Sequence, residues 1–158
     1  MHPVFLLGAT AYLIAEERLT VIDAGLPGSW LLLRRAIRRI GRDAGQIARI
    51  LLTHEHPDHA GGARAVARAT GVEMGGAAQL ADGELLGVQG GLAVLRTPGH
   101  IPGSLASTPP ATGSCSAVTR SGATADISTI AFGHLAPLHG DCTAGMRDLL
   151  ARWTSPTG

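Results

Sequence analysis

Apolar and polar positions alternate in blocks along the first half of the chain, and the blocks predict strands and helices in turn. Two stretches rich in apolar and β-branched residues flank the polar turn at residues 16–18, which predicts a β-hairpin. After Ser29, a candidate helix N-cap, apolar residues recur at helical spacing until Gly41, a typical helix stop. The predicted elements are strands at Phe5 to Ile14, Leu19 to Ile22 and Ile47 to Thr53, and helices at Trp30 to Ile40 and Gly61 to Thr70.

The second half of the chain has a weaker pattern. Short apolar runs predict strands, and the turn at residues 109–113 joins two of them into a hairpin. Ser114 to Thr129 is rich in Ser, Ala, Thr and Gly and has little apolar periodicity for a segment expected in a core. Thr143 to Trp153 predicts a closing amphipathic helix. The predicted strands are Val72 to Gly75, Leu85 to Val88, Leu92 to Arg96, Ser104 to Ser107, Ser114 to Arg120 and Ile127 to Phe132.

Length and composition predict one globular domain, residues 1–158, long enough to bury a core. The formal net charge of +1 gives no electrostatic reason to expect a nucleic acid or an anionic membrane as partner. An arginine stripe on the first predicted helix is interpreted as a solvent-facing surface rather than an RNA-binding one, because no aromatic residues are interleaved with it. The stripe consists of Arg34, Arg35, Arg38, Arg39 and Arg42.

Two features bear on the cellular compartment. Val4 to Ala15 is mostly apolar but too short to span a bilayer, and the residues ahead of it lack the basic start of a signal peptide. Cys115 and Cys142 are isolated, which predicts neither a disulfide framework nor a thiolate zinc site. We therefore expect a cytoplasmic protein, while the sequence predicts no particular oligomeric state.

The strongest chemical signal is the run His-x-His-x-Asp-His at residues 54–59. If the preceding strand continues into it, side chains two residues apart point the same way, so His54 and His56 face one point. Imidazole nitrogens with a carboxylate oxygen suit zinc, with iron or manganese as alternatives. The candidate ligands in this run are His54, His56, Asp58 and His59.

This run resembles the signature of the metallo-β-lactamase superfamily, and other segments are similar to further parts of that pattern. Val21 to Gly25 resembles an early strand-end motif, which implies that Asp23 lies near the metals and orients a ligand histidine. Thr97 to Ser104 resembles the turn that presents a third histidine to the first metal. His100 would therefore complete a set with the first two histidines of the run.

The resemblance also implies a second metal, bound by Asp58, His59 and a last histidine that follows a strand. Gly133-His134 is similar to that last ligand, and His139 is the competing candidate. We favour His134 because it directly follows the predicted strand at Ile127 to Phe132.

The fold implied by the resemblance is α/β, a four-layer αββα sandwich with a shortened C-terminal half. Only residues 121–126 separate two predicted strands where the family has a loop and a helix, whereas a parallel crossover needs about a dozen residues. The family's bridging carboxylate is missing, because its position falls near Val118 or Thr119. Asp126 would replace it only if the shortened loop turned inward.

These ligands predict a metal-dependent hydrolase. Three histidines and a water match an open catalytic zinc site, where a zinc-bound hydroxide would attack an ester, thioester or lactone-type small molecule, with Asp58 as the catalytic proton acceptor. Without the bridging carboxylate we expect one zinc, and a second one only if it is held weakly. The alternative is a degenerate family member that binds a ligand or partner without turnover. An iron oxygenase ranks last, since its carboxylate ligand would be the missing one.

Overall fold

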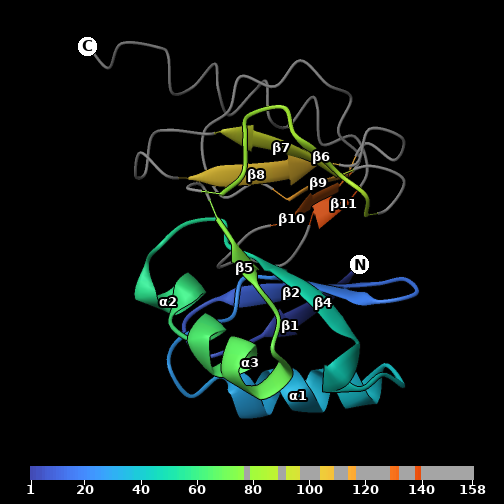
Figure 1. Ribbon diagram of the computed structural model, residues 1–158, viewed down its shortest axis with the longest axis vertical. Helices are drawn as coiled ribbons and strands as arrows, with labels where there is room; N and C mark the ends of the chain where they lie inside the picture. Colours follow the sequence, from blue (N-terminus) through green and yellow to red (C-terminus); the bar gives the residue numbers. More distant parts are fainter. Residues whose placement is uncertain are drawn as a thin grey trace.

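Two β-sheets lie face to face, and helices cover the outer face of the first sheet (Figure 1). The computed structural model describes residues 1–76, 79–88, 92–96, 104–108, 114–116, 129–131 and 138–139. This α+β arrangement gives three of the four predicted layers, one of helices and two of sheet. The predicted closing helix, Thr143 to Trp153, lies outside the described residues.

The first sheet has the strand order β1-β2-β3-β4-β5. β1, β2 and β3 are antiparallel neighbours, and β4 and β5 then add in parallel. The β2–β3 hairpin at the turn of residues 16–18 confirms the prediction. The strands are β1 (His2–Phe5), β2 (Thr10–Ala15), β3 (Leu19–Ile22), β4 (Ile47–Leu51) and β5 (Met74–Gly75), and the helices are α1 (Trp30–Arg39), the 3₁₀ turn η1 (Ala44–Gln46), α2 (Pro57–Ala60) and α3 (Ala63–Thr70).

The prediction of one strand from Phe5 to Ile14 was wrong. The chain turns back after β1, where the N–H of Leu6 donates to the carbonyl of Ala9 at 2.9 Å. Gly8 has a φ of 83°, a left-handed conformation that glycine adopts without steric cost. The apolar run therefore folds into two antiparallel strands instead of one long one.

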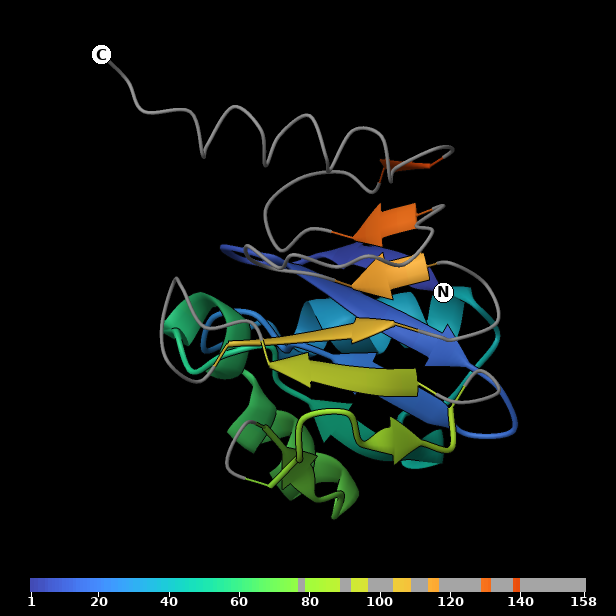
Figure 2. The ribbon, with the colours of Figure 1, turned by 90° about the horizontal axis from the view of Figure 1, so that it is seen from above.

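The second sheet has the order β11-β10-β9-β8-β7-β6, and Figure 2 looks down on it. The predicted hairpin around residues 109–113 is confirmed, since β8 and β9 pair antiparallel. β10 lies parallel to β9. The residues between these two strands, 117–128, lie outside the described residues, so the expected shortage of crossover residues stays a prediction. The strands are β6 (Leu85–Leu86), β7 (Leu92–Arg96), β8 (Leu105–Thr108), β9 (Ser114–Ser116), β10 (Thr129–Ala131) and β11 (Leu138–His139).

β2 and β3 are buried on both faces of the first sheet, which explains why they are mostly apolar. Leu13 of β2 faces the helical layer, where it joins Leu33 and Ile37 of α1 in one core cluster. Its neighbours Tyr12 and Ile14 point the other way and pack against the second sheet in another cluster. Burying a large apolar side chain stabilises a protein by about 1.5–3 kcal/mol, so these two layers fix the sheet between them.

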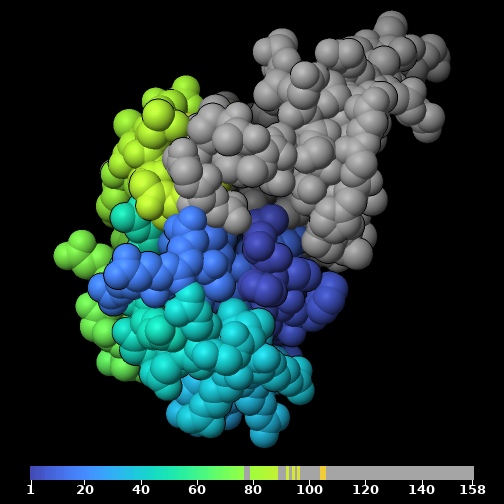
Figure 3. All heavy atoms as spheres, turned by 90° about the vertical axis from the view of Figure 1, so that its right-hand side faces the viewer, coloured from blue at the N-terminus to red at the C-terminus, as the bar shows by residue number. Residues whose placement is uncertain are grey.

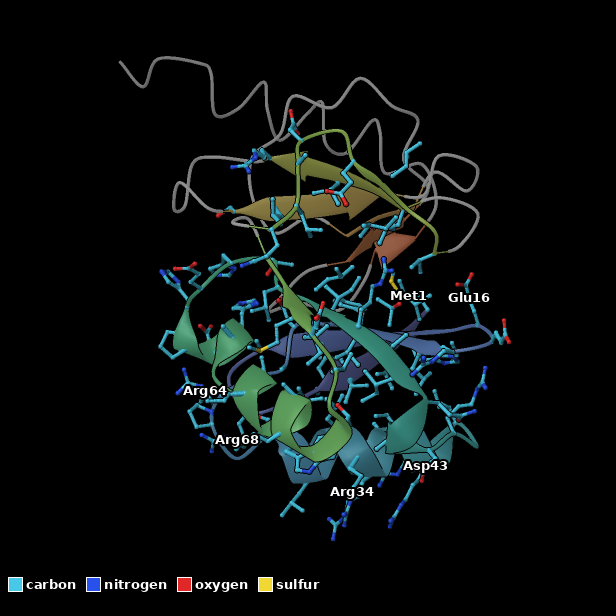
Figure 4. The ribbon with its side chains drawn as sticks, viewed as in Figure 1. Met1, Glu16, Arg34, Asp43, Arg64 and Arg68 are labelled. Carbon is cyan, nitrogen blue, oxygen red and sulfur yellow. The ribbon has the colours of Figure 1, made fainter. Side chains whose placement is uncertain are left out.

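Helix α1 begins and ends where the sequence predicts. The carbonyl of Ser29 accepts hydrogen bonds from the N–H groups of Leu32 and Leu33, although the buried Ser29 hydroxyl has no hydrogen-bond partner among the described residues. Gly41, with a φ of 72°, follows the last turn. Arg35, Arg38 and Arg39 are exposed, and Figure 4 shows Arg34 pointing away from the sheet.

From the side, the N-terminal strands in dark and medium blue lie above the light-blue and cyan residues that follow them in the chain (Figure 3). In the described part of the chain, no helix is long and apolar enough to cross a membrane.

Candidate functional site

The candidate ligands lie where two neighbouring parallel strands end. Ile22 of β3 pairs with Leu51 of β4, so the residues that follow both strands meet at one edge of the sheet. The N–H of Asp23 donates to the carbonyl of Leu51 at 2.9 Å, which joins the two exits. Sites in α/β folds commonly occupy such carboxyl ends.

Asp23 connects the two strand ends through its buried carboxylate, in a residue that is 1% exposed. Oδ1 accepts the backbone N–H of Thr53 at 2.8 Å. Oδ2 accepts the Thr53 hydroxyl at 2.7 Å and lies 2.7 Å from Nδ1 of His59. The φ of Asp23 is 58°, a left-handed conformation in which Asp and Asn are enriched. Its backbone conformation thus directs the carboxylate toward residues 54–59, called here the ligand run.

The ligand run docks on the loop after β3 through backbone contacts. Pro57 occupies the first turn of α2, where its missing N–H costs nothing. The N–H of Ala24 donates to the carbonyl of His59 at 2.8 Å, and the N–H of Gly62 donates to the carbonyl of Gly25 at 2.7 Å. A Cβ at Gly62 would collide with the carbonyl oxygen of Ala24, so only glycine allows this approach.

The histidine rings of the run cluster together, although the expected reason was wrong. β4 ends at Leu51, so strand alternation does not orient His54 and His56. The loop instead brings their ring centroids to 4.7 Å, and those of His54 and His59 to 4.1 Å. His54 is 3% exposed and His59 is fully buried.

Asp58 lies on the open side of His59. Its Oδ2 is 3.6 Å from Nε2 of His59, and its side chain is 28% exposed. Burial alone would lower the pKa of His59, but the hydrogen bond to Asp23 and the charges of Asp23 and Asp58 outweigh it and raise that pKa above its ordinary value. The two carboxylates therefore favour a positive charge on the His59 ring.

The arrangement fits part of a metal site. With Nδ1 of His59 engaged by Asp23, the Nε2 lone pair faces the Asp58 carboxylate. Two ligand atoms on one tetrahedral zinc lie about 3.4 Å apart, close to the observed separation of Nε2 and Oδ2. Within the described residues, however, no group of three or more His, Cys, Asp or Glu side chains is placed to hold an ion. The described part of the chain thus supplies pairs of ligands rather than a full set.

Most of the ligands predicted to complete the set lie outside the described residues. His100, His134 and Asp126 lie outside the described residues, and of His139 only the backbone, in β11, is described. The N–H of Leu105 donates to the carbonyl of Thr53 at 2.7 Å, which brings the start of β8 against the ligand run. The roles of all these histidines therefore remain predictions.

Two residues matter more in the structure than in the sequence analysis. Thr53 stood only as the last residue of a predicted strand, yet its hydroxyl lies between Asp23 and the rings of His54 and His59, at 3.1 and 3.4 Å from their Nδ1 atoms. Gly62 had no assigned role. The only local signals for them are the threonine directly before the run and the glycine pair after it.

Comparison with known proteins gives one family and one fold. Residues 4–79 match the family model of the Metallo-beta-lactamase superfamily, which consists mostly of metal-dependent hydrolases. The uncharacterized protein YobT of Bacillus subtilis (strain 168) is 42% identical over 57 residues, a stretch that spans 35% of this chain and 23% of YobT.

Solved structures resemble the chain in fold. A B3 metallo-β-lactamase with an active-site glutamic acid superposes with a TM-score of 0.74 at 21% identity, covering 95% of this chain and 85% of that enzyme. A β-lactamase from Chitinophaga pinensis gives a TM-score of 0.58 at 21% identity, covering 68% of this chain and 56% of that one. The chain thus spans little more than half of that enzyme and less than a quarter of YobT. With its ligand run inside the matched residues, this chain is a metallo-β-lactamase-fold protein whose N-terminal half carries the sequence pattern of that superfamily.

Proposed function

We propose that this chain is a zinc-dependent hydrolase acting on an ester, a thioester or a lactone. The observation that carries the proposal is the position of His59, whose Nδ1 is engaged by Asp23 at 2.7 Å and whose Nε2 faces Asp58 at 3.6 Å. Burying a carboxylate and a histidine beside a second, partly exposed carboxylate is costly unless the group holds a cation. This geometry therefore supports metal binding more than a purely structural role.

The proposed sites combine described and undescribed residues. His54, His56 and His100 would hold one zinc, which we expect to be the tighter site. Asp58, His59 and His134 would hold a second ion, weakened because Val118 or Thr119 stands where a bridging carboxylate belongs. A zinc ion bound at the tighter site would supply a water that ionises near neutral pH and would polarise the substrate carbonyl.

The chain's own side chains would prepare the reaction. Asp23 orients His59, and the exposed side of Asp58 would accept the proton of the attacking water. The substrate is proposed to be a small molecule, since the net charge of +1 favours no polyanion. The isolated cysteines support a cytoplasmic location.

Metal content tests the proposal directly. Protein purified without a chelator would be measured by plasma mass spectrometry, together with His54→Ala, Asp58→Asn and, as control, His2→Ala in the exposed end of β1. We expect about one zinc per chain, lost in His54→Ala but kept in Asp58→Asn and His2→Ala, with far-ultraviolet circular dichroism confirming that each variant is folded.

The other outcomes are equally informative. About two zincs would mean that another residue, with Asp126 tested first, replaces the missing carboxylate. No metal in the folded parent, and no hydrolysis of generic esters or lactones, would overturn the proposal and favour a non-catalytic binding protein.

A further inference from the structure

The Thr53 hydroxyl lies at the centre of a buried network that the proposed metal ligands share. Its Oγ1 is 2.7 Å from Oδ2 of Asp23 and 3.1 Å from Nδ1 of His54. Nδ1 of His59 is 2.7 Å from the same carboxylate oxygen. Thr53 is 5% exposed, so this network is shielded from solvent.

Counting protons decides the direction of each bond. An ionised carboxylate only accepts hydrogen bonds, so the single hydroxyl proton of Thr53 goes to Asp23. Oγ1 then presents only lone pairs to His54, and Nδ1 of His54 must carry the proton that joins them. The reverse arrangement would set two lone pairs against each other at 2.7 Å between Thr53 and Asp23.

We propose that Thr53 is a positioning residue that links Asp23 to His54 by hydrogen bonds. One buried carboxylate then fixes the tautomers of two ligand histidines. Asp23 acts on His59 directly and on His54 through the Thr53 hydroxyl. Both rings then carry their proton on Nδ1 and turn an Nε2 lone pair outward, the form that binds a metal. The tautomer part of this inference stands on the hydrogen bonds alone, whereas its effect on zinc affinity rests on the proposed function.

The test compares Thr53→Val, which keeps the branched shape but loses the hydroxyl, with Thr53→Ser, which keeps the hydroxyl. Thr20→Val, at a buried position in β3 that is 4% exposed, controls for losing a hydroxyl elsewhere in the core. Long-range proton–nitrogen NMR of the metal-free proteins at about pH 8.5, where free histidine is neutral, reports which ring nitrogen of His54 carries the proton. Zinc affinity is measured by competition with a chromophoric chelator.

We expect His54 to carry its proton on Nδ1 in the parent, Thr53→Ser and Thr20→Val, and to populate the other tautomer in Thr53→Val. Zinc affinity should fall roughly 10- to 100-fold in Thr53→Val and stay near the parent value in the other two variants. A parent His54 protonated on Nε2, or a Thr53→Val protein with unchanged tautomer and affinity, would overturn the inference. If the parent binds no zinc, the proposed hydrolase fails, but the NMR measurement on the parent still decides the role of Thr53, even where Thr53→Val does not fold.

Discussion

Replacing Asp23 with Asn changes the charge of the buried network while leaving its shape. Asn tolerates the left-handed φ of 58° as Asp does, so the backbone adds no strain of its own. The amide oxygen can still accept the N–H of Thr53 in place of Oδ1. The amide NH₂ then stands where Oδ2 accepted two hydrogen bonds, from the Thr53 hydroxyl and from Nδ1 of His59.

The size of the effect follows from these bonds. Two hydrogen bonds to a charged acceptor, each contributing about 1.5–3 kcal/mol, become two neutral ones contributing about 0.5–1.5 kcal/mol each. The free energy of unfolding of the metal-free protein should therefore fall by about 2–3 kcal/mol. His59 must now accept at Nδ1, and the freed Thr53 hydroxyl can donate to His54, so both rings move their proton to Nε2. Zinc affinity should drop roughly 10- to 100-fold.

Urea unfolding in the presence of a chelator, followed by a zinc competition titration, measures both quantities. Asp43→Asn is the matched control, because Asp43 is exposed and caps η1 by accepting the N–H of Gly45 at 2.8 Å, which Asn does equally well. The free energy of unfolding of Asp43→Asn should stay within about 0.5 kcal/mol of the parent value. An Asp23→Asn protein that matches the parent in both stability and zinc affinity would refute the hydrogen-bond directions assigned to this network.

Three further predictions concern packing and pH. Gly62→Ala should destabilise the fold by about 1–3 kcal/mol in urea unfolding because its Cβ meets the Ala24 carbonyl, whereas Gly87→Ala, with nothing within 4 Å, should be neutral; equal effects would contradict the close approach. Leu33→Ala, in the buried core, should lower the free energy of unfolding by about 2–5 kcal/mol. Leu31 is 61% exposed, so Leu31→Ala should lower it by less than about 0.5 kcal/mol. Because the pKa of His59 is raised in the folded state, its contribution to the stability of the chelated protein should be complete below the unfolded value of 6.5 and be lost as the pH rises through the folded value. Melting temperatures of parent and His59→Gln should then converge at alkaline pH, and a gap that widens there would show that the shift has the opposite sign.

Local signals predicted the first half of the chain well. The β2–β3 hairpin and α1 follow from polar turn residues, helical spacing and a glycine stop, all readable over a few positions. One exception was the run from Phe5 to Ile14, in which apolar residues continue through the turn and only Gly8 signals it. Periodicity alone does not show where an apolar chain reverses direction.

The network around Asp23 could not be predicted in the same way. The ligand run predicted which side chains gather, but the role of Thr53 depends on Ile22 pairing with Leu51, a contact between strands far apart in the sequence. The requirement for glycine at position 62 likewise depends on how closely the loop after β3 approaches. Contributions from His100 and His134 stay predictions, because both residues lie outside the described part of the chain.

This division of the site gives metal content a specific meaning. The residues that orient His54 and His59 come from the ends of two neighbouring strands, inside the segment that matches the superfamily. This segment supplies two ligands to each proposed ion, so each ion is still one ligand short of the four that a zinc site usually has when one water is counted. Zinc counts on the parent protein and on His100→Ala, taken together, therefore report whether His100 in the second half of the chain contributes a ligand. A bound ion that persists in His100→Ala would show that this ion does not depend on His100, and loss of the ion would locate a decisive ligand in the second half.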